Sequence, residues 1–323
     1  MPHLILLGFR SLLAFSTLTH IHHLPQVRQQ AQGSLHGKKR YKGALQTFQN
    51  ILEVEGPRGL FKGMGTALIN VPLFWGIYWS GYEYMKLYFQ QETNLILPVQ
   101  HILSATTAGA FADVISNPFW VVRTRIQTQI LHPERHFPGT PSTLSMFQYI
   151  YQHEGFFAFY RGLSASLLGL THVAIQFPLY EYLKEISRTR RGATETTALD
   201  HFFASVTAKI VASSITYPHE VLRVRLQDTE RISSSVPLEG KKHLSSKLQV
   251  TRNISSSLMS FHPLSIFSSS SLVMMTKKII REEGVKALWS GFRISMIRVI
   301  PSTTTSFLTY EYVTKLLKNE DHR

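Results

Sequence analysis

The 323-residue sequence contains no cysteine, and it has no uninterrupted apolar run of the length that marks a simple membrane span. The first absence excludes disulfides, thiolate nucleophiles and cysteine-ligated metals, and the second excludes a plain span of about 18 apolar residues. Acidic residues are also few, 20 against 34 lysines and arginines, so the formal net charge is +14. Such an excess favours anionic partners: nucleic acid, acidic lipid or a phosphate-bearing ligand.

Motifs of the common enzyme classes are missing as well. The sequence contains no HExxH, no glycine-rich phosphate loop followed by Lys-Ser/Thr, and no nucleophile elbow. The fragment GMG at 63–65 lacks the third glycine of a dinucleotide loop. We therefore predict that the protein is not an enzyme, has no cofactor of its own and holds no metal.

What is present is a threefold internal repeat built from three kinds of sequence mark. The first kind is PFWVVRTRIQ at 118–127 and PHEVLRVRLQ at 218–227. The second is EGPRGLFKG at 55–63, EGFFAFYRG at 154–162 and EGVKALWSG at 283–291. The third is GYEYMK at 81–86, LYEYLK at 179–184 and TYEYVTK at 309–315. Because the marks recur in one order, they predict one body made of three similar units.

Five stretches are apolar or small for about one membrane thickness, each with a few polar residues: 65–89, 98–117, 163–182, 200–217 and 292–313. Helices that face lipid on one side and a watery cavity on the other have this composition. The pattern predicts an all-α membrane protein. A nucleic-acid-binding protein is the rival that the charge allows, but such a protein gathers its basic residues on one surface, whereas many here stand singly beside the repeated prolines and glutamates.

A polar or aromatic stripe precedes the acid of each Tyr-Glu mark. Stepping back 13, 9 and 5 residues from Glu83, Glu181 and Glu311 gives one helical face in each unit: Asn70, Phe74 and Tyr78; Leu168, His172 and Gln176; Arg298, Ser302 and Ser306. Charge inside a membrane costs about 2.5–3.5 kcal/mol per residue, so we expect Arg298 and the glutamates to face an interior cavity. The alternative is a solvated face of soluble helices. Taken alone, His172 is as readily a packed histidine, and Phe74 a core residue.

The proline marks place charges one helical turn apart. Glu220 and Arg223 are three residues apart and share a face, and the second unit has Trp120 and Arg123 in the same places. Since tryptophan replaces the acid, a ring of alternating charge is incomplete. Three roles for Trp120 stay open: it seals a constriction, stacks on a base, or only packs helices together.

These marks resemble the signature of the mitochondrial carrier family, which is Pro-x-acid-x-x-base-x-base followed by acid-Gly-x-x-x-x-aromatic-base-Gly. Trp120, together with GLTHVAIQFPLYEYLK at 169–184 and RVIPSTTTSFLTYEY at 298–312, resembles the branch that carries NAD, pyrimidine nucleotides, FAD and folate. TYPHEVLRVRLQ at 216–227 is most similar to the mitochondrial NAD carriers.

The resemblance implies a pseudo-threefold barrel of six tilted transmembrane helices, arranged as three pairs that are each joined by a short matrix helix. The expected repeats are 1–90, 97–187 and 200–318, and Pro118 and Pro218 are expected to bend odd-numbered helices. It further implies a monomeric, multi-pass protein of the mitochondrial inner membrane that imports NAD by alternating-access exchange. Pyrimidine nucleotides, FAD and folate are the alternative cargoes.

The resemblance also assigns roles to particular residues. The expected substrate contacts are Asn70, Tyr78, Gly169, His172, Gln176 and Arg298. Arg298 would hold pyrophosphate, while Tyr78, Trp75 or Trp79 would stack on a base. The expected matrix gate is Trp120, Arg123, Glu220 and Arg223. The expected cytoplasmic gate is Tyr82, Glu83, Lys86, Tyr180, Glu181, Lys184, Tyr310 and Glu311. Cardiolipin is expected near the Glu-Gly marks, at helix N-termini with Lys62 or Arg161.

The sequence departs from this pattern in three places. If Arg28 is aligned with the last base, Ile21, His23 and Gln26 stand where proline, acid and base belong, so we expect an atypical first helix at 1–23. A serine-rich insertion of about 231–272 lies in the third unit and is expected to be a loop. Thr314 and Ser290 replace two bases of the signature. A variant without transport activity is therefore a further alternative.

Overall fold

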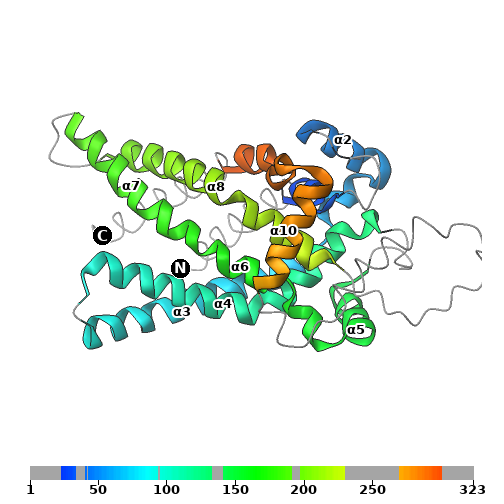
Figure 1. Ribbon diagram of the computed structural model, residues 1–323, viewed down its shortest axis with the longest axis horizontal. Coiled ribbons are helices and arrows are strands. Elements are labelled where there is room, and N and C mark those ends of the chain that lie inside the picture. Colours follow the sequence, from blue (N-terminus) through cyan, green and yellow to red (C-terminus); the bar gives the residue numbers. More distant parts are fainter. Residues whose placement is uncertain are drawn as a thin grey trace, which may run out of the picture.

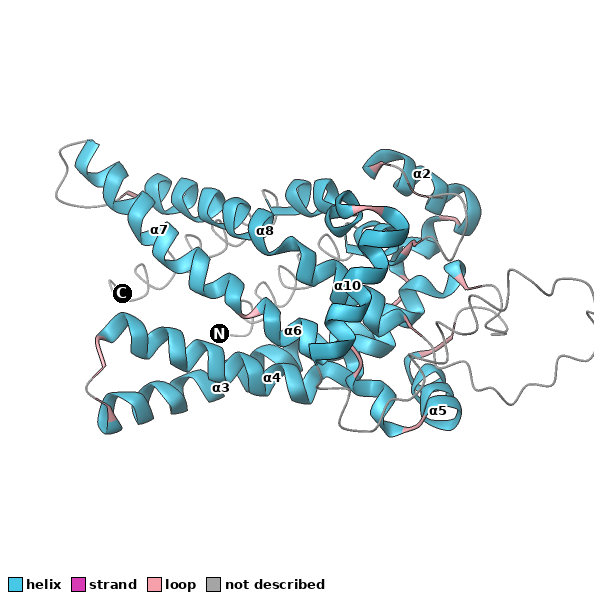
Figure 2. Cartoon of the chain, viewed as in Figure 1, coloured by secondary structure: helices cyan, strands magenta, loops and turns pink. Residues whose placement is uncertain are grey.

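The described part of the chain consists of three similar units of long and short helices. The computed structural model describes residues 23–33, 41, 43–93, 95–132, 141–190, 197–229 and 269–299. Two long hairpins, α3 with α4 and α7 with α8, run across Figure 1, and the short helices α2, α5 and α10 lie toward its right-hand side. Every element in the described residues is a helix (Figure 2), which confirms the all-α prediction.

Within the described residues, each unit runs from a helix through a short helix and a 3-10 turn to a returning helix. The first unit contains helical residues 23–31, α2 (Ala44–Glu55), η2 (Pro57–Phe61) and α3 (Met64–Glu92). The second contains α4 (Leu97–Thr128), η3 (Gln129–Leu131), α5 (Thr143–Glu154), η4 (Phe156–Tyr160), α6 (Leu163–Gly169) and α7 (Thr171–Arg190). The third contains α8 (Ala198–Asp228), α10 (Ser269–Glu283), η6 (Val285–Trp289) and helical residues 292–299.

The helix bounds agree with three of the predicted apolar stretches and differ elsewhere. Stretches 65–89, 98–117 and 200–217 lie within α3, α4 and α8. The stretch 163–182 is interrupted, since α6 ends at Gly169 and α7 begins at Thr171. Helix α10 begins at Ser269, so residues 269–272 of the predicted loop are helical. Residues 1–22 of the expected atypical first helix and the rest of that loop lie outside the described residues.

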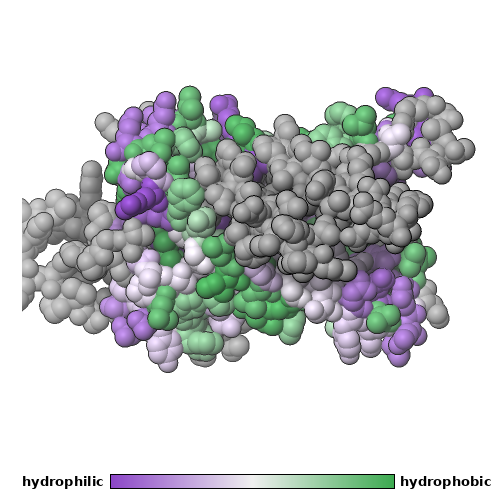
Figure 3. All heavy atoms as spheres, turned by 180° about the vertical axis from the view of Figure 1, so that it is seen from behind, coloured by the Kyte–Doolittle hydropathy of each residue, from purple (hydrophilic) through white to green (hydrophobic). Residues whose placement is uncertain are grey.

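Long helices of membrane-spanning dimensions carry the fold. The segments Pro57–Glu92 and Phe156–Arg190 are long and apolar enough to cross a bilayer. Helices α4 and α8 have 32 and 31 residues and stay helical through Pro118 and Pro218, which gives each about 47 Å at 1.5 Å per residue. On the face drawn in Figure 3, hydrophobic side chains gather along the middle of the lower edge, and hydrophilic ones toward its ends.

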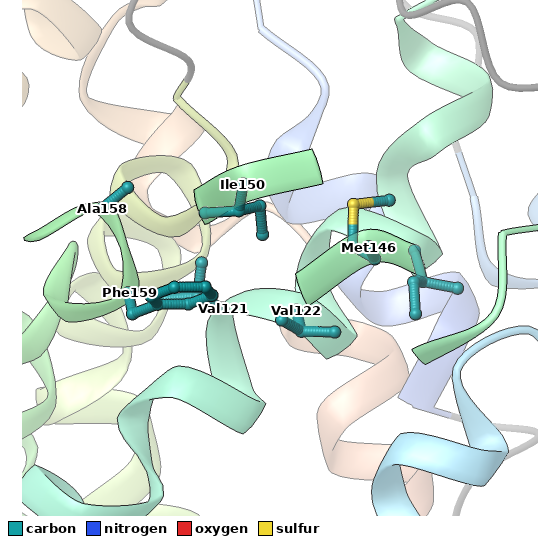
Figure 4. Close-up of a cluster of buried hydrophobic side chains, with 7 residues drawn as sticks. Val121, Val122, Met146, Ile150, Ala158 and Phe159 are labelled. Atoms are coloured by element: carbon teal, nitrogen blue, oxygen red, sulfur yellow. The ribbon is translucent and has the colours of Figure 1, made fainter. Parts of the chain in front are cut away.

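The short helices pack onto the long ones through equivalent apolar clusters. In the second unit, Ile150 of α5 and Phe159 of η4 pack against Val121 of α4 (Figure 4), and these side chains are 0%, 5% and 0% exposed. The corresponding clusters contain Leu24, Ile51 and Leu60 in the first unit, and Leu222, Ile279 and Leu288 in the third. Burying a side chain of this size contributes about 1.5–3 kcal/mol, so each short helix is held firmly in place.

Glycine is required twice in each Glu-Gly mark, because both glycines have positive φ. Gly155 ends α5 at φ 80°, and Gly162 precedes α6 at φ 78°. Gly162 also touches the third unit: a Cβ there would lie 2.9 Å from Cγ of Gln227 and 3.0 Å from the carbonyl oxygen of Arg223. The recurring closing glycine is thus a point of contact between units.

We expect Gly162→Ala to destabilise the protein by about 2–5 kcal/mol. About 1–2 kcal/mol arises from left-handed backbone and about 1–3 kcal/mol from overpacking. Gly63 has the same left-handed backbone conformation as Gly162. A Cβ at Gly63 would lie 3.1 Å from the flexible side-chain Cγ of Gln127 and 3.5 Å from a carbonyl oxygen, so we expect Gly63→Ala to cost less stability. Gly43→Ala, with nothing within 4 Å, is the control. Thermal unfolding in detergent gives the ranking, and an equal effect of all three substitutions would contradict it.

A closed ring of arginine contacts joins the three units at the ends where the short helices lie. Arg28, Arg125 and Arg225 each form a two-pronged ion pair with the glutamate of their own Glu-Gly mark: Glu55, Glu154 and Glu283. Each Nε also donates to a backbone carbonyl of the next unit: to Gln127 at 3.0 Å, Gln227 at 3.1 Å and Gln30 at 2.9 Å. All six charged side chains are at most 8% exposed. We call this set the arginine ring.

The ring makes stability depend on pH through Glu55. Burial raises the pKa of the Glu55 carboxyl, but the hydrogen bonds and positive charges of Arg28 and Lys62 outweigh burial and hold the pKa below its ordinary value of 4.5. A carboxyl with a lowered folded pKa contributes stability above the unfolded pKa and loses it as the pH falls through the folded one.

We therefore expect the Tm difference between the wild type and Glu55→Gln to be constant above about pH 5 and to shrink in more acidic solution. Melting curves between pH 3 and pH 8, at fixed ionic strength, measure it. The exposed Glu53→Gln is the control and should follow the wild-type profile. A difference that grows on acidification would overturn the assignment.

Candidate functional site

Asn70 is the most deeply buried of the predicted substrate contacts. It lies on α3 and is 0% exposed, and neither polar atom of its side-chain amide has a hydrogen-bond partner among the described residues. An unpaired buried polar group costs about 1–3 kcal/mol. Asn70 is therefore a residue whose amide can bind a ligand atom at little further cost.

An aromatic column continues along the same helix. Phe74, Tyr78 and Tyr82 are four residues apart, and their rings lie nearly parallel, with centroids 6.2 Å apart in both pairs and interplanar angles of 10° and 13°. Trp75 and Trp79 stack on each other instead and are 49% and 55% exposed. Of the residues expected to stack on a base, Tyr78 lies in the half-buried column, while both tryptophans lie on the more exposed side of α3.

The substrate contacts predicted in the second unit meet at the break between α6 and α7. His219 of α8 lies against Gly169, where a Cβ would be 2.7 Å from its Nε2. His172 Nδ1 is 3.1 Å from Thr216 Oγ1, and Gln176 is also hydrogen-bonded to His172. Leu170, between α6 and α7, keeps a right-handed helical backbone (φ −63°, ψ −21°), so the break is a local tightening of the helix. Neither the break nor the position of His219 beside Gly169 was predicted from the sequence.

Arg298 lies within electrostatic reach of two further cations on other elements. Arg298, in helical residues 292–299, acts on both Arg123 of α4 and Lys209 of α8. We call these three residues the cation cluster. Like charges gathered in this way favour a polyanion such as pyrophosphate. Lys209 was not predicted, although a lysine within the apolar stretch 200–217 was a signal for it. Ser302 and Ser306 lie outside the described residues.

Three of the four predicted matrix-gate residues come together, through contacts that differ from a ring of ion pairs. The indole of Trp120 lies under both arginines, with Cζ of Arg223 4.6 Å and Cζ of Arg123 5.3 Å from the ring centroid. The carboxylate of Glu220 accepts a hydrogen bond of 2.8 Å from Nε2 of Gln26. Cation–π contacts contribute about 0.5–2 kcal/mol. Gln26, the residue at the position of a base in the first unit, is thus a gate partner that the prediction omitted.

The predicted cytoplasmic-gate residues pair within or between neighbouring helices. Glu83 and Lys86 on α3 are 3.5 Å apart, and Glu181 and Lys184 on α7 are 2.5 Å apart, each three residues apart in the chain. The hydroxyl of Tyr82 is 2.8 Å from His101 Nδ1 on α4, and that of Tyr180 is 2.7 Å from His201 Nδ1 on α8. Tyr310 and Glu311 lie outside the described residues. The histidine partners were not predicted.

The sequence analysis also made expectations about a lipid site at the Glu-Gly marks and about metal ions. Lys62 pairs with Glu55 at 2.6 Å, and Arg161 pairs with Glu154 and donates to the carbonyl of Thr229 at 2.6 Å. These cations are engaged within the protein, so a cardiolipin site stays a prediction, for which the backbone N–H groups would supply the contacts. Within the described ranges, no group of three or more His, Asp or Glu comes together as a metal site.

Comparison with known proteins places these features in a family. The sequence profile of the family described as "Mitochondrial carrier protein" matches residues 2–93, 96–191 and 194–321. The chain is 33% identical over 302 residues to "Mitochondrial nicotinamide adenine dinucleotide transporter 1" of Saccharomyces cerevisiae, covering 91% of this chain and 71% of that protein. It is 33% identical over 293 residues to "Solute carrier family 25 member 33" of Bos taurus, covering 87% and 77%.

A plant relative differs in the location that its name gives. The chain is 30% identical over 285 residues to "Nicotinamide adenine dinucleotide transporter 1, chloroplastic" of Arabidopsis thaliana, covering 87% of this chain and 80% of that protein. The three matched segments of the family profile each contain one Glu-Gly mark.

Proposed function

Since the chain belongs to the mitochondrial carrier family and is a membrane transport protein, we propose that it imports NAD across the mitochondrial inner membrane by alternating-access exchange. The observation that carries the proposal is the cation cluster of Arg123, Lys209 and Arg298. Three cations from three elements match the paired negative charges of a pyrophosphate. Relatives in yeast and plants named as NAD transporters support the same cargo.

The aromatic column would contact the bases of the cargo. A dinucleotide carries planar rings on both sides of its pyrophosphate, and a base stacked on an aromatic side chain contributes about 1–3 kcal/mol. Tyr78 lies next to Phe74 and Tyr82 in the column, and Asn70 offers an unpaired amide one turn below it. Cations and stacking faces on different elements favour a cargo that has both phosphate and base.

In the conformation described here, the matrix gate is engaged. Contacts cross between units at that gate, from Gln26 to Glu220 and from Arg223 to Trp120. On the opposite side the ion pairs of Glu83 and Glu181 stay within their own helices, and the units are joined there by the tyrosine–histidine hydrogen bonds described above. We take this conformation as the one open to the cytoplasm. Binding of cargo to Arg123 would draw it from Trp120 and so lower the cost of opening the matrix side, as alternating access requires.

Uptake of labelled NAD by proteoliposomes tests the proposal. We expect exchange against internal NAD, and competition by external NAD above that by pyrimidine nucleotides, FAD or folate. Inhibition by the last three compounds but not by NAD would show that NAD is not the cargo, and would leave the proposal of a transport function unchanged. Correct insertion without any exchange would favour a variant that does not transport. Cell fractionation tests whether the protein is located in mitochondria or in plastids.

A further inference from the structure

The tyrosines of two Tyr-Glu marks make the same contact with a histidine of the next unit. The hydroxyl of Tyr82 lies 2.8 Å from Nδ1 of His101, and that of Tyr180 lies 2.7 Å from Nδ1 of His201. The paired rings are also arranged alike, with centroids 6.4 and 6.3 Å apart and interplanar angles of 20° and 33°. Tyr310, the tyrosine of the third mark, lies outside the described residues.

The two histidines occupy one position of the repeat. His101 precedes Pro118 of α4 by 17 residues, and His201 precedes Pro218 of α8 by the same number. Each tyrosine directly precedes the glutamate of its mark. A contact that occurs twice at matching positions, between the same atoms and at nearly the same distance, is a property of the repeated unit and not of one local packing.

These hydrogen bonds join different units, whereas the charged residues of the same gate do not. Helices α3 and α7 carry the tyrosines, and α4 and α8, which begin the following units, carry the histidines. Glu83 and Glu181 pair with a lysine three residues further along their own helix, and both glutamate side chains are 60% exposed. Among the described residues of the cytoplasmic gate, the tyrosine hydroxyls are therefore the groups that are held across a unit boundary.

Closing this side requires the gate residues to exchange their present partners for partners in other units. An exposed ion pair on one helix contributes little, so the glutamates are released easily. A partly buried hydrogen bond contributes more, about two- to tenfold in an equilibrium constant. The two tyrosine–histidine bonds are thus the stronger of the two sets of contacts that hold the gate residues as they are described here.

We propose that His101 and His201 are positioning residues of the cytoplasmic gate. Each holds the hydroxyl of a gate tyrosine from the preceding unit, and the two bonds stabilise the conformation in which the cytoplasmic side is open. Losing either bond shifts the population toward the conformation that is closed on this side and open to the matrix. The inference rests on the transport function and the gates proposed above, but not on the identity of the cargo.

The absence of cysteine from the chain allows a single thiol to report on that shift. Val27 is 2% exposed and belongs to a buried cluster with Leu131 and Val224, so residues of all three units meet there. Opening of the matrix side would part this cluster and expose the thiol of Val27→Cys to a maleimide. Val121 is 0% exposed and packs within the second unit, so Val121→Cys reports on general loosening of the fold instead.

We expect His101→Phe, which keeps a ring and removes Nδ1, to raise the rate of labelling at Val27→Cys about two- to tenfold, in detergent and without cargo. The rate at Val121→Cys should stay unchanged. In the Tyr82→Phe background the same histidine substitution should change neither rate, because the hydroxyl that it holds is already gone.

His153→Phe is the matched control. His153 is exposed, and its Nδ1 is hydrogen-bonded at 3.0 Å to the carbonyl of Tyr149 in its own helix, so this substitution removes a histidine bond that joins no units. It should leave both labelling rates as in the wild type. His201→Phe, tested with Tyr180→Phe, repeats the measurement on the second pair.

Three results would overturn the proposal: no rise at Val27→Cys, an equal rise at both reporters, or a His101→Phe effect that persists in the Tyr82→Phe background. An equal rise would make His101 an ordinary packing residue. Val224→Cys, in the same cluster, replaces the reporter if Val27→Cys does not fold. The labelling needs no cargo, so failure of the wild type to take up NAD would defeat the proposed function and leave this result to be judged separately.

Discussion

Arg298→Ala is expected to reduce the initial rate of NAD uptake by proteoliposomes about a hundredfold or more. Hydrogen bonds to charged groups contribute about 1.5–3 kcal/mol each, and a guanidinium bonds phosphate through two of them. Since about 1.4 kcal/mol is a factor of ten, losing both removes at least two orders of magnitude. The measurement compares uptake rates at equal amounts of inserted protein.

The same substitution should not harm the fold. Arg298 acts on Arg123 and Lys209 as a like charge, so removing it relieves repulsion, and we expect an unchanged or slightly higher Tm. Arg293→Ala is the matched control, because Arg293 belongs to the same helical segment but is exposed; it should retain nearly full uptake. Uptake by Arg298→Ala within twofold of the wild type would remove Arg298 from the site.

Arg125→Ala is expected to destabilise the protein by about 3–5 kcal/mol, enough to prevent correct assembly in many preparations. Removing one partner of a buried pair is strongly destabilising, and Glu154, which is 1% exposed, would keep only the more exposed Arg161 as a partner. Arg125 also donates to the carbonyls of Gln227 and Thr229 at 3.1 and 3.0 Å, so those acceptors lose a partner as well. Thermal unfolding in detergent, or the yield of monodisperse protein, measures the effect.

A surface pair provides the contrast. Arg188 and Glu185 on α7 form an ion pair with side chains that are 42% and 57% exposed, and such pairs contribute about 0–1 kcal/mol. Arg188→Ala should therefore cost far less than Arg125→Ala. Removing Arg125 and Glu154 together should cost less than the sum of the single losses, since the buried carboxylate is removed with its partner and only the more exposed Arg161 loses a contact. Additive losses would show that the two side chains act independently.

The repeat made much of the fold predictable. Equivalent marks predicted three similar units, because a pattern that recurs three times carries far more information than one occurrence. The resemblance to the carrier family implied the helix pairs, the short helices and the proline-bearing long helices. The family profile matching three consecutive segments confirms that repetition. Phe74 and Tyr78 of the predicted stripe on α3 stack in one column, and the expectation that this face lines a cavity stays a prediction.

Other features could not be predicted from the sequence, because they depend on which helices become neighbours in the fold. The break at Leu170 follows from no proline or charge, and the packing of His219 against Gly169 is a contact between distant segments. The pairings of Tyr82 with His101 and of Tyr180 with His201 depend on helix register. The roles of the predicted gate and substrate residues are untested by the geometry alone and stay predictions.

The arginine ring sets the order in which this protein can be completed during synthesis. Arg225 donates to the carbonyl of Gln30, 195 residues earlier in the chain, and Arg125 needs the carbonyl of Gln227. A growing chain that has emerged only as far as α7 therefore has two arginines paired with their glutamates but no closed circuit. The circuit can close only when Arg225 and Glu283 have been made, so a chain that stops before residue 283 leaves the arginine ring incomplete.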